Sequence, residues 1–133
     1  MKSDRKDKEK LFPEWFRKAE EDELSARDIL NDQEGAPSTV CFLSQQIAEK
    51  CLKGYLVYKK NEFPRIHLLD KLINLCREID RSFDDIMKEA KFLSDFYVAT
   101  RYPGDFPDFD FKDAEKAFEA ALKIKNFVLK RIK

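Results

Sequence analysis

The sequence is poor in the residues that metal sites, disulfide frameworks and phosphate-binding loops require. Its 133 residues include one histidine, three glycines and three cysteines. A single histidine excludes an ordinary histidine-rich zinc site, and the cysteines form no CxxC pair. The sequence contains no glycine-rich phosphate loop, no Ser/His/Asp order and no cluster of metal ligands. We therefore expect no metal, no cofactor and no catalytic residue.

A charge imbalance and long apolar runs are also missing. The 26 basic and 26 acidic residues cancel, so no global basic field favours nucleic acid, although a local patch remains open. No run approaches membrane-spanning length, and the charged start, MKSDRKDKEK, has no apolar signal region. Together with an odd number of cysteines, this favours a cytoplasmic protein without a membrane partner. Length and composition predict one domain over residues 11–133, after a charged, frayed segment at 1–10.

Apolar residues repeat at spacings of three and four along five segments, and no segment alternates with period two. Turns rich in glycine and proline separate several of them, at 31–38 and at 100–110. We therefore expect an all-α, antiparallel up-and-down bundle of four long helices plus one short helix. The predicted inner positions are Trp15, Ala19, Asp22, Ala26 and Ile29; Phe42 to Tyr58; Leu68, Leu69, Leu72, Ile73, Leu75 and Cys76; Phe83, Ile86, Ala90, Leu93 and Tyr97; and Ala114, Ala117, Phe118, Ala121, Ile124 and Val128.

Three helix boundaries have local signals. Pro13 sits where a first-turn proline is tolerated. Ser82 with Asp85 predicts a helix start, and Asp110 with Asp113 predicts the start of the last helix. We expect the central helix to begin after the turn at 31–38 and to run to about Lys60, before Phe63-Pro64.

The central stretch 42–58, FLSQQIAEKCLKGYLVY, is apolar around most of a helix circumference, which is typical of a helix buried on several sides. Polar residues are set into it at spacings of three and four, so they stack along one side. Charged groups are rarely buried without partners. The other helices should therefore cover most of this helix and leave the polar inset facing a groove or a second chain. The inset consists of Gln45, Gln46, Glu49, Lys50 and Lys53.

Three further positions each allow a structural and a functional interpretation. Asp22 lies on an inner stripe, either as a satisfied carboxylate or as a partner for the basic groups of the central helix. His67 is either a cap or packing residue, or a site residue facing Lys50 or Lys53. Arg101 either donates hydrogen bonds to the last carbonyl groups of the preceding helix or binds a phosphate through two parallel hydrogen bonds. In the second case the ring of Tyr102 beside it can stack on a base.

Two aromatic residues of the predicted fourth helix, Phe92 and Phe96, lie off its inner stripe. They indicate a wider apolar face than a monomer needs. We therefore expect a homodimer whose seam includes this helix and lies near Arg101.

Four motifs, in order, resemble those of HEPN domains, small helical domains found beside nucleotidyltransferases and in prokaryotic toxin systems. Trp15-x3-Ala19-x2-Asp22 is similar to the family's opening W-x3-A-x2-DL, with Glu23 in place of the leucine. QQIAEKCLK at 45–53 resembles QQ-x-x-EK-x-LK. His67-Leu68-Leu69 is similar to HDL, with Leu69 where aspartate is common. The last motif, Tyr97-x3-Arg101-Tyr102-Pro103, resembles Y-x3-RYP.

The resemblance implies a helical bundle that commonly dimerises. It also implies three kinds of role: a domain paired with a small nucleotidyltransferase, a substrate-binding half of such an enzyme, or an RNA-cleaving toxin. The toxins use an arginine followed four to six residues later by histidine. Arg101 matches that arginine, but positions 106–108 are Phe, Pro and Asp.

We therefore favour a non-catalytic module that binds a nucleotide or acts as the helical partner of a separately encoded minimal nucleotidyltransferase, in a toxin–antitoxin-like pair. The alternatives are an RNA-cleaving ribonuclease, in which His67 replaces the missing histidine, and a structural assembly subunit. The candidate ligand-binding residues are Asp22, Gln46, Glu49, Lys50, Lys53, His67, Arg101 and Tyr102.

Overall fold

The structure, a computed structural model, describes residues 8–99 and 108–132, without the side chains of residues 98 and 99. Every regular element in the described residues is helical, which confirms the all-α class. The elements are α2 (Phe12–Asp32), α3 (Pro37–Lys60), α4 (Leu69–Ile79), a 3₁₀ helix η1 (Arg81–Ile86), α5 (Met87–Ser94), α6 (Phe96–Ala99) and α7 (Phe111–Leu129).

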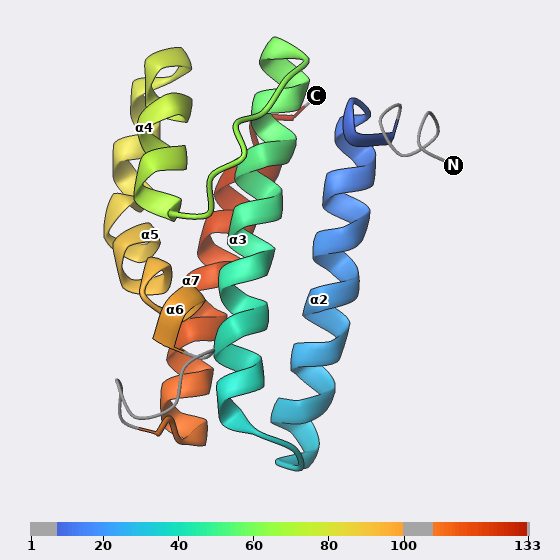
Figure 1. Cartoon of the computed structure of the whole chain (residues 1–133), viewed down its shortest axis with the longest axis vertical. Coiled ribbons are helices and arrows are strands. Elements are labelled where there is room, and N and C mark those ends of the chain that lie inside the picture. The colour runs from blue at the N-terminus through green and yellow to red at the C-terminus, as the bar shows by residue number, and fades with distance from the viewer. Residues whose placement is uncertain (1–7, 100–107, 133) are drawn as a thin grey trace.

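Helix α3 is the centre of the bundle, with α2 along one side and α4, α5 and α7 along the other (Figure 1). More than half of its 24 residues are buried, among them Ile47, Leu52 and Tyr55. Burying a large apolar side chain stabilises a fold by about 1.5–3 kcal/mol. The prediction that the other helices cover the central one is therefore confirmed.

Helices α2 and α3 lie close together because of one glycine. A Cβ atom on Gly54 would lie 3.0 Å from the ring of Phe16 and 3.1 Å from the Cβ of Trp15. Ala19 and Ala26 present small buried side chains on the α2 side. This approach brings the polar residues of α2 within reach of those on α3.

The segment after α4 differs from the single helix that the sequence predicts. It divides into η1, α5 and α6, with a turn at Asp95. The cap of η1 is Asp80 rather than Ser82, because the Asp80 carboxylate accepts from the Ser82 amide at 2.9 Å and from its hydroxyl at 2.6 Å. Phe83 and Ile86 are buried three residues apart, a spacing that places them on one side of a 3₁₀ turn.

The two aromatic residues expected to be off the inner stripe have different environments. Phe92 is 43% exposed, whereas Phe96 is only 6% exposed. Phe96 packs edge-on against Phe92 and Phe109, with ring centroids 5.4 and 5.0 Å away. The expectation that both rings widen an exposed apolar face is therefore wrong for Phe96.

Helix α7 begins and packs as predicted. Asp110 accepts from the Asp113 amide, and the Asp113 carboxylate accepts from the Asp110 amide, which together form a capping box. Its buried alanines let it approach α3 closely; they are Ala114, Ala117 and Ala121. Within residues 8–99 and 108–132, no helix has both the length and the apolar composition needed to cross a membrane.

Candidate functional site

The polar inset of α3 divides between two neighbours instead of facing one groove. Lys50 and Lys53 are three residues apart and lie on the same side of the helix, yet their side chains meet different partners. Lys50 forms an ion pair with Asp22 of α2. Lys53 turns to the side covered by the connector between α3 and α4, where it pairs with Glu49.

Glu49 is the common partner of a group of polar side chains that includes Lys53, Gln45 and His67; we call it the His67 group. Its carboxylate is 7% exposed and accepts from the Lys53 ammonium at 3.0 Å and from the Gln45 amide at 3.1 Å. Nδ1 of His67 lies 3.2 Å from each of its two oxygens. A buried carboxylate without such partners would be strongly destabilising. These contacts satisfy Glu49 and fix its orientation beneath the imidazole.

Two hydrogen bonds hold the connector between α3 and α4, residues 61–68, and the start of α4 next to Glu49. The backbone carbonyl of His67 accepts from the Gln45 amide at 3.0 Å. Two residues later, the amide of Leu69 donates to the hydroxyl of Ser94 at 2.8 Å. The imidazole stacks on Tyr97, with a centroid distance of 4.5 Å and an interplanar angle of 10°. His67 is therefore held by α3 below it and by α6 beside it.

The His67 side chain is nevertheless 48% exposed. Nδ1 is directed at a buried carboxylate and one face of the ring stacks on Tyr97, so only the remaining part of the ring contributes to this exposure. A carboxylate that orients one imidazole nitrogen is a common arrangement where the other nitrogen exchanges protons or binds a ligand.

The structure brings most of the predicted site residues together in two separate groups. One is the ion pair of Asp22 with Lys50, and the other consists of Glu49, Lys53 and His67. Gln46 connects to the second group because its amide donates to the Gln45 side chain at 2.7 Å. Arg101 and Tyr102 lie outside the described residues.

Three residues that belong to or contact the His67 group are not among the candidate ligand-binding residues from the sequence: Gln45, which was placed only in the polar inset, Tyr97, which was placed in an inner stripe and in the last motif, and Ser94. Gln45 and Glu49 have the i, i+4 spacing that makes a helical hydrogen bond possible, so the sequence held a signal for this pair. Tyr97 lies 30 residues beyond His67 and was assigned to an inner stripe. No local pattern indicates that its ring would stack on the imidazole.

Thiol chemistry and metal binding find little support in the described residues. The thiols of Cys41, Cys51 and Cys76 are all buried, and burial raises the pKa of each to about 12, which suppresses the reactive thiolate. In the part of the chain that the structure describes, no three His, Cys, Asp or Glu side chains come together as possible metal ligands.

Comparison with known proteins identifies the family of this chain. The family model for the HEPN domain matches residues 12–132. The fold is similar to the crystal structure of TT1696 from Thermus thermophilus, with a TM-score of 0.81 and 28% identity over 91% of this chain and 98% of that one.

The fold is also similar to the crystal structure of ST0689, an archaeal HEPN homologue. The TM-score is 0.73, with 31% identity over 92% of this chain and 98% of that one. No curated protein matches the chain significantly. Because the family model spans residues 12–132 and both structures share the fold over most of their length, the chain belongs to the HEPN family.

Proposed function

We propose that this HEPN domain is a non-catalytic binding module, the helical partner of a separately encoded minimal nucleotidyltransferase in a toxin–antitoxin-like pair. The observation that carries this choice is the internal pairing of the candidate lysines. Lys50 pairs with Asp22, and Lys53, 4% exposed, pairs with Glu49. Both ammonium groups already have a carboxylate partner, which argues against phosphate binding at this part of α3 and leaves the transferase-partner role of the family as the one we propose.

Co-expression tests the proposal directly. The chain is produced together with each small nucleotidyltransferase of its native genome, and the mixtures are separated by size-exclusion chromatography. We expect one of the transferases to elute with the chain as a complex. If none does, the proposal is wrong.

Calorimetric titration with ATP, GTP and CTP distinguishes the nucleotide-binding alternative. Because the lysines are paired internally, we expect no heat of binding from the chain alone. Heat that disappears in Lys50→Ala but persists in Lys71→Ala, a change at an exposed lysine of α4, would establish nucleotide binding instead.

One observation favours a second candidate, a metal-independent ribonuclease. His67 is oriented by the buried Glu49 carboxylate and is about half exposed, as a general base or acid needs to be. The test is incubation of the purified chain with tRNA and mRNA. Cleavage that falls at least about a hundredfold in His67→Ala would support this candidate, since general acid–base catalysis typically contributes that much. Intact RNA would exclude it.

A further inference from the structure

The connector between α3 and α4 runs back along α3, from the end of that helix to the start of α4 (Figure 1). Asn61, with a φ of 62°, turns the chain at the end of α3. Among the described residues, no backbone–backbone hydrogen bond involves positions 62–67. Such a segment depends on its side-chain contacts to stay in place, and it can open locally at a lower free energy than the helices around it.

Phe63 is the first of two side-chain anchors of the connector. Its ring packs edge-on against Trp15 of α2, with the ring centroids 4.6 Å apart. The ammonium group of Lys53 lies 5.7 Å from the centre of the Phe63 ring. Lys53 is buried, and its carboxylate partner is Glu49. The ring of Phe63 therefore helps to shield the ammonium of this ion pair from solvent.

His67 is the second anchor. Its Nδ1 lies 3.2 Å from each carboxylate oxygen of Glu49, and its backbone carbonyl accepts a hydrogen bond from Gln45. The stack of its ring on Tyr97 fixes the other side of the imidazole. The first anchor therefore covers the ammonium of the ion pair, and the second covers its carboxylate.

The two anchors are mechanically linked because only three residues separate them. One of the three is Pro64, whose ring fixes the backbone angle φ. Another, Ile66, packs against the apolar core. In so short and stiff a segment, one anchor cannot move far from its site without pulling on the other. We therefore expect the connector to open as one unit.

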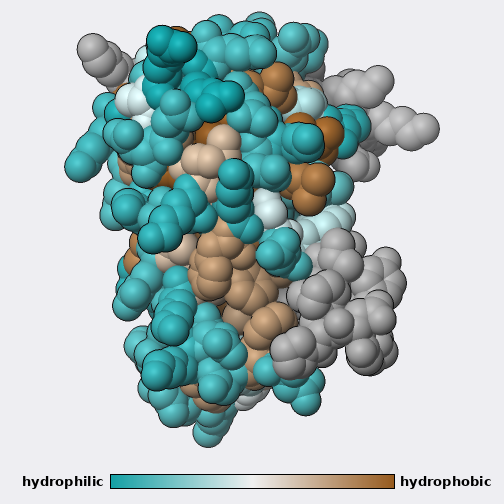
Figure 2. All heavy atoms as spheres, turned by 90° about the vertical axis from the view of Figure 1, so that its left-hand side faces the viewer, coloured by the Kyte–Doolittle hydropathy of each residue, from teal (hydrophilic) through white to brown (hydrophobic). Residues whose placement is uncertain are grey.

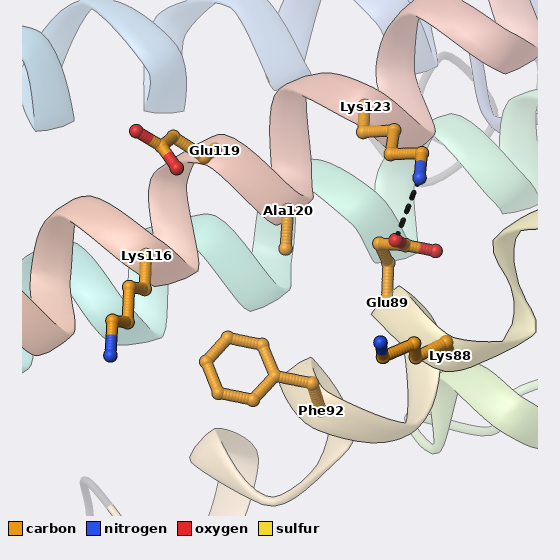
Figure 3. A pocket seen from close by; sticks show the side chains of 7 residues that line it. All are labelled: Lys88, Glu89, Phe92, Lys116, Glu119, Ala120 and Lys123. Atoms are coloured by element: carbon orange, nitrogen blue, oxygen red, sulfur yellow. Dashed lines mark hydrogen bonds and ion pairs between the residues drawn. The ribbon is translucent and has the colours of Figure 1, made fainter.

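Ion pairs elsewhere on the surface lack this cover. The face that α4 and α5 turn outwards is largely hydrophilic, with hydrophobic atoms gathered near its middle (Figure 2). In the groove between α5 and α7, Lys123 donates to Glu89 at 2.9 Å, close to the 3.0 Å of the pair beneath the connector (Figure 3). The Lys123 side chain is 61% exposed, whereas that of Lys53 is 6% exposed. The connector contributes the cover that Lys53 has and Lys123 lacks.

We propose that the connector is a lid that opens as one unit and controls access to the Glu49–Lys53 ion pair. Opening uncovers the carboxylate, the ammonium and the ring of Tyr97 together, so a molecule that binds these groups must first displace the connector. This inference does not depend on the proposed transferase partner. Its tests use the chain alone, so the lid and the transferase complex can fail separately.

Acetylation of lysines by an N-hydroxysuccinimide ester, followed at each residue by mass spectrometry, measures how often the lid opens. The matched control is Lys123, which forms a similar ion pair without cover. We expect wild-type Lys53 to react at least about tenfold more slowly than Lys123, since it reacts only in the open state. Phe63→Ala should raise the rate at Lys53 by about tenfold or more, because it removes a buried aromatic contact. A wild-type Lys53 as reactive as Lys123, or one that stays protected in Phe63→Ala, overturns the proposal.

Two single-copy residues test whether the lid opens as one unit, since Trp15 is the only tryptophan and His67 the only histidine. His67→Ala, a change at the far end of the lid, should increase both the acrylamide quenching of Trp15 fluorescence and the acetylation of Lys53. Phe63→Ala should shift the imidazole proton signals of His67 in the NMR spectrum. The control Phe12→Ala removes a ring of α2 that packs on α3 instead of on the connector, and it should leave Lys53 and His67 unchanged. If His67→Ala affects neither Trp15 nor Lys53, the single lid is wrong.

A denaturant series on the wild type separates opening of the lid from unfolding of the bundle. Cys51 of α3 is 0% exposed, so its reaction with Ellman's reagent reports the loss of the core. The acetylation rate of Lys53 should rise only weakly with guanidinium chloride, because the open lid exposes little new surface, whereas the rate at Cys51 should rise steeply. Equal dependences at Lys53 and Cys51 would show that only unfolding exposes Lys53, and they would overturn the proposal without any variant.

Discussion

Glu49 shows how one buried carboxylate organises its surroundings. It pairs with Lys53, accepts from Gln45 and orients His67, while it is almost completely removed from solvent. A buried ion pair contributes little net stability compared with well-packed apolar residues, but breaking it leaves an uncompensated charge. At the scale of the residue, four members of the QQ-x-x-EK-x-LK motif, Gln45, Gln46, Glu49 and Lys53, therefore form a linked set of hydrogen-bonded polar groups.

Removal of the Glu49 carboxylate provides a direct test of this role. In Glu49→Ala the Lys53 ammonium, 4% exposed, loses its partner, and we expect the free energy of unfolding to fall by about 3–5 kcal/mol. Urea denaturation followed by circular dichroism measures the change. The double variant Glu49→Leu/Lys53→Met, which removes both charges, should be more stable than Glu49→Ala.

The matched control for this prediction is Arg17→Ala, which breaks ion pairs at the surface of α2. Its denaturation midpoint should stay close to that of the wild type, since exposed pairs contribute little. If Glu49→Ala is as harmless as this control, the buried pair is not a structural requirement.

At the scale of the element, the contact between α2 and α3 depends on the missing side chain of Gly54. Alanine is the better helix former, but its Cβ would lie 3.0 Å from the ring of Phe16. We expect Gly54→Ala to cost about 1–3 kcal/mol through overpacking, measured by thermal or urea unfolding. The double variant Gly54→Ala/Phe16→Leu should recover part of the loss. A neutral Gly54→Ala would mean that the two helices can separate at no cost.

The cap of η1 gives this part of the fold a pH dependence. Hydrogen bonds from Ser82 to the Asp80 carboxylate, helped by Arg131, hold the pKa of Asp80 below its usual value of 3.8. The stabilisation is therefore complete above the unfolded-state pKa and disappears as the pH falls through the folded-state pKa. Asp80→Ala should cost about 1 kcal/mol near neutral pH. The difference from the wild type should shrink as the pH falls below 3.8 and through the lowered folded-state pKa of Asp80.

Unfolding curves of both proteins from pH 7 to pH 2 provide the measurement. Asp80→Asn is the informative control, because asparagine also caps a helix but does not titrate. The difference between Asp80→Asn and Asp80→Ala should remain constant across this range. A wild-type advantage over Asp80→Ala that persists unchanged at pH 2 would contradict the role assigned to the carboxylate.

At the scale of the whole molecule, the three cysteines report on the integrity of the core. Cys41, Cys51 and Cys76 are each 0% exposed, and burial raises the pKa of each thiol to about 12. At pH 8 we expect none to react with Ellman's reagent on the time scale of minutes in the native protein, and all three to react in guanidinium chloride. Leu24→Cys supplies an exposed thiol as the positive control. A native thiol that reacts as fast as this control would reveal a local opening of the bundle.

The sequence by itself determined the elements that depend on local physics. Apolar spacing located α2, α3, α4 and α7, because a stripe repeating every three or four residues must be buried on one side. The capping box of Asp110 and Asp113 and the burial of α3 followed from the same local rules. The four HEPN-like motifs identified the family, which the match over residues 12–132 shows.

Only the tertiary structure decided which partner each side chain meets. Lys50 and Lys53 look alike in the sequence, yet one pairs with Asp22, 28 residues before it, and the other with its own helix neighbour Glu49. Phe96 is buried because Phe109, across the α6–α7 connection, packs on it, and Phe92 lacks such cover. The stacking of His67 on Tyr97 likewise depends on where two distant segments meet. Helical periodicity fixes the direction of a side chain on its own helix, but the neighbour in that direction is set by packing between segments far apart in the chain.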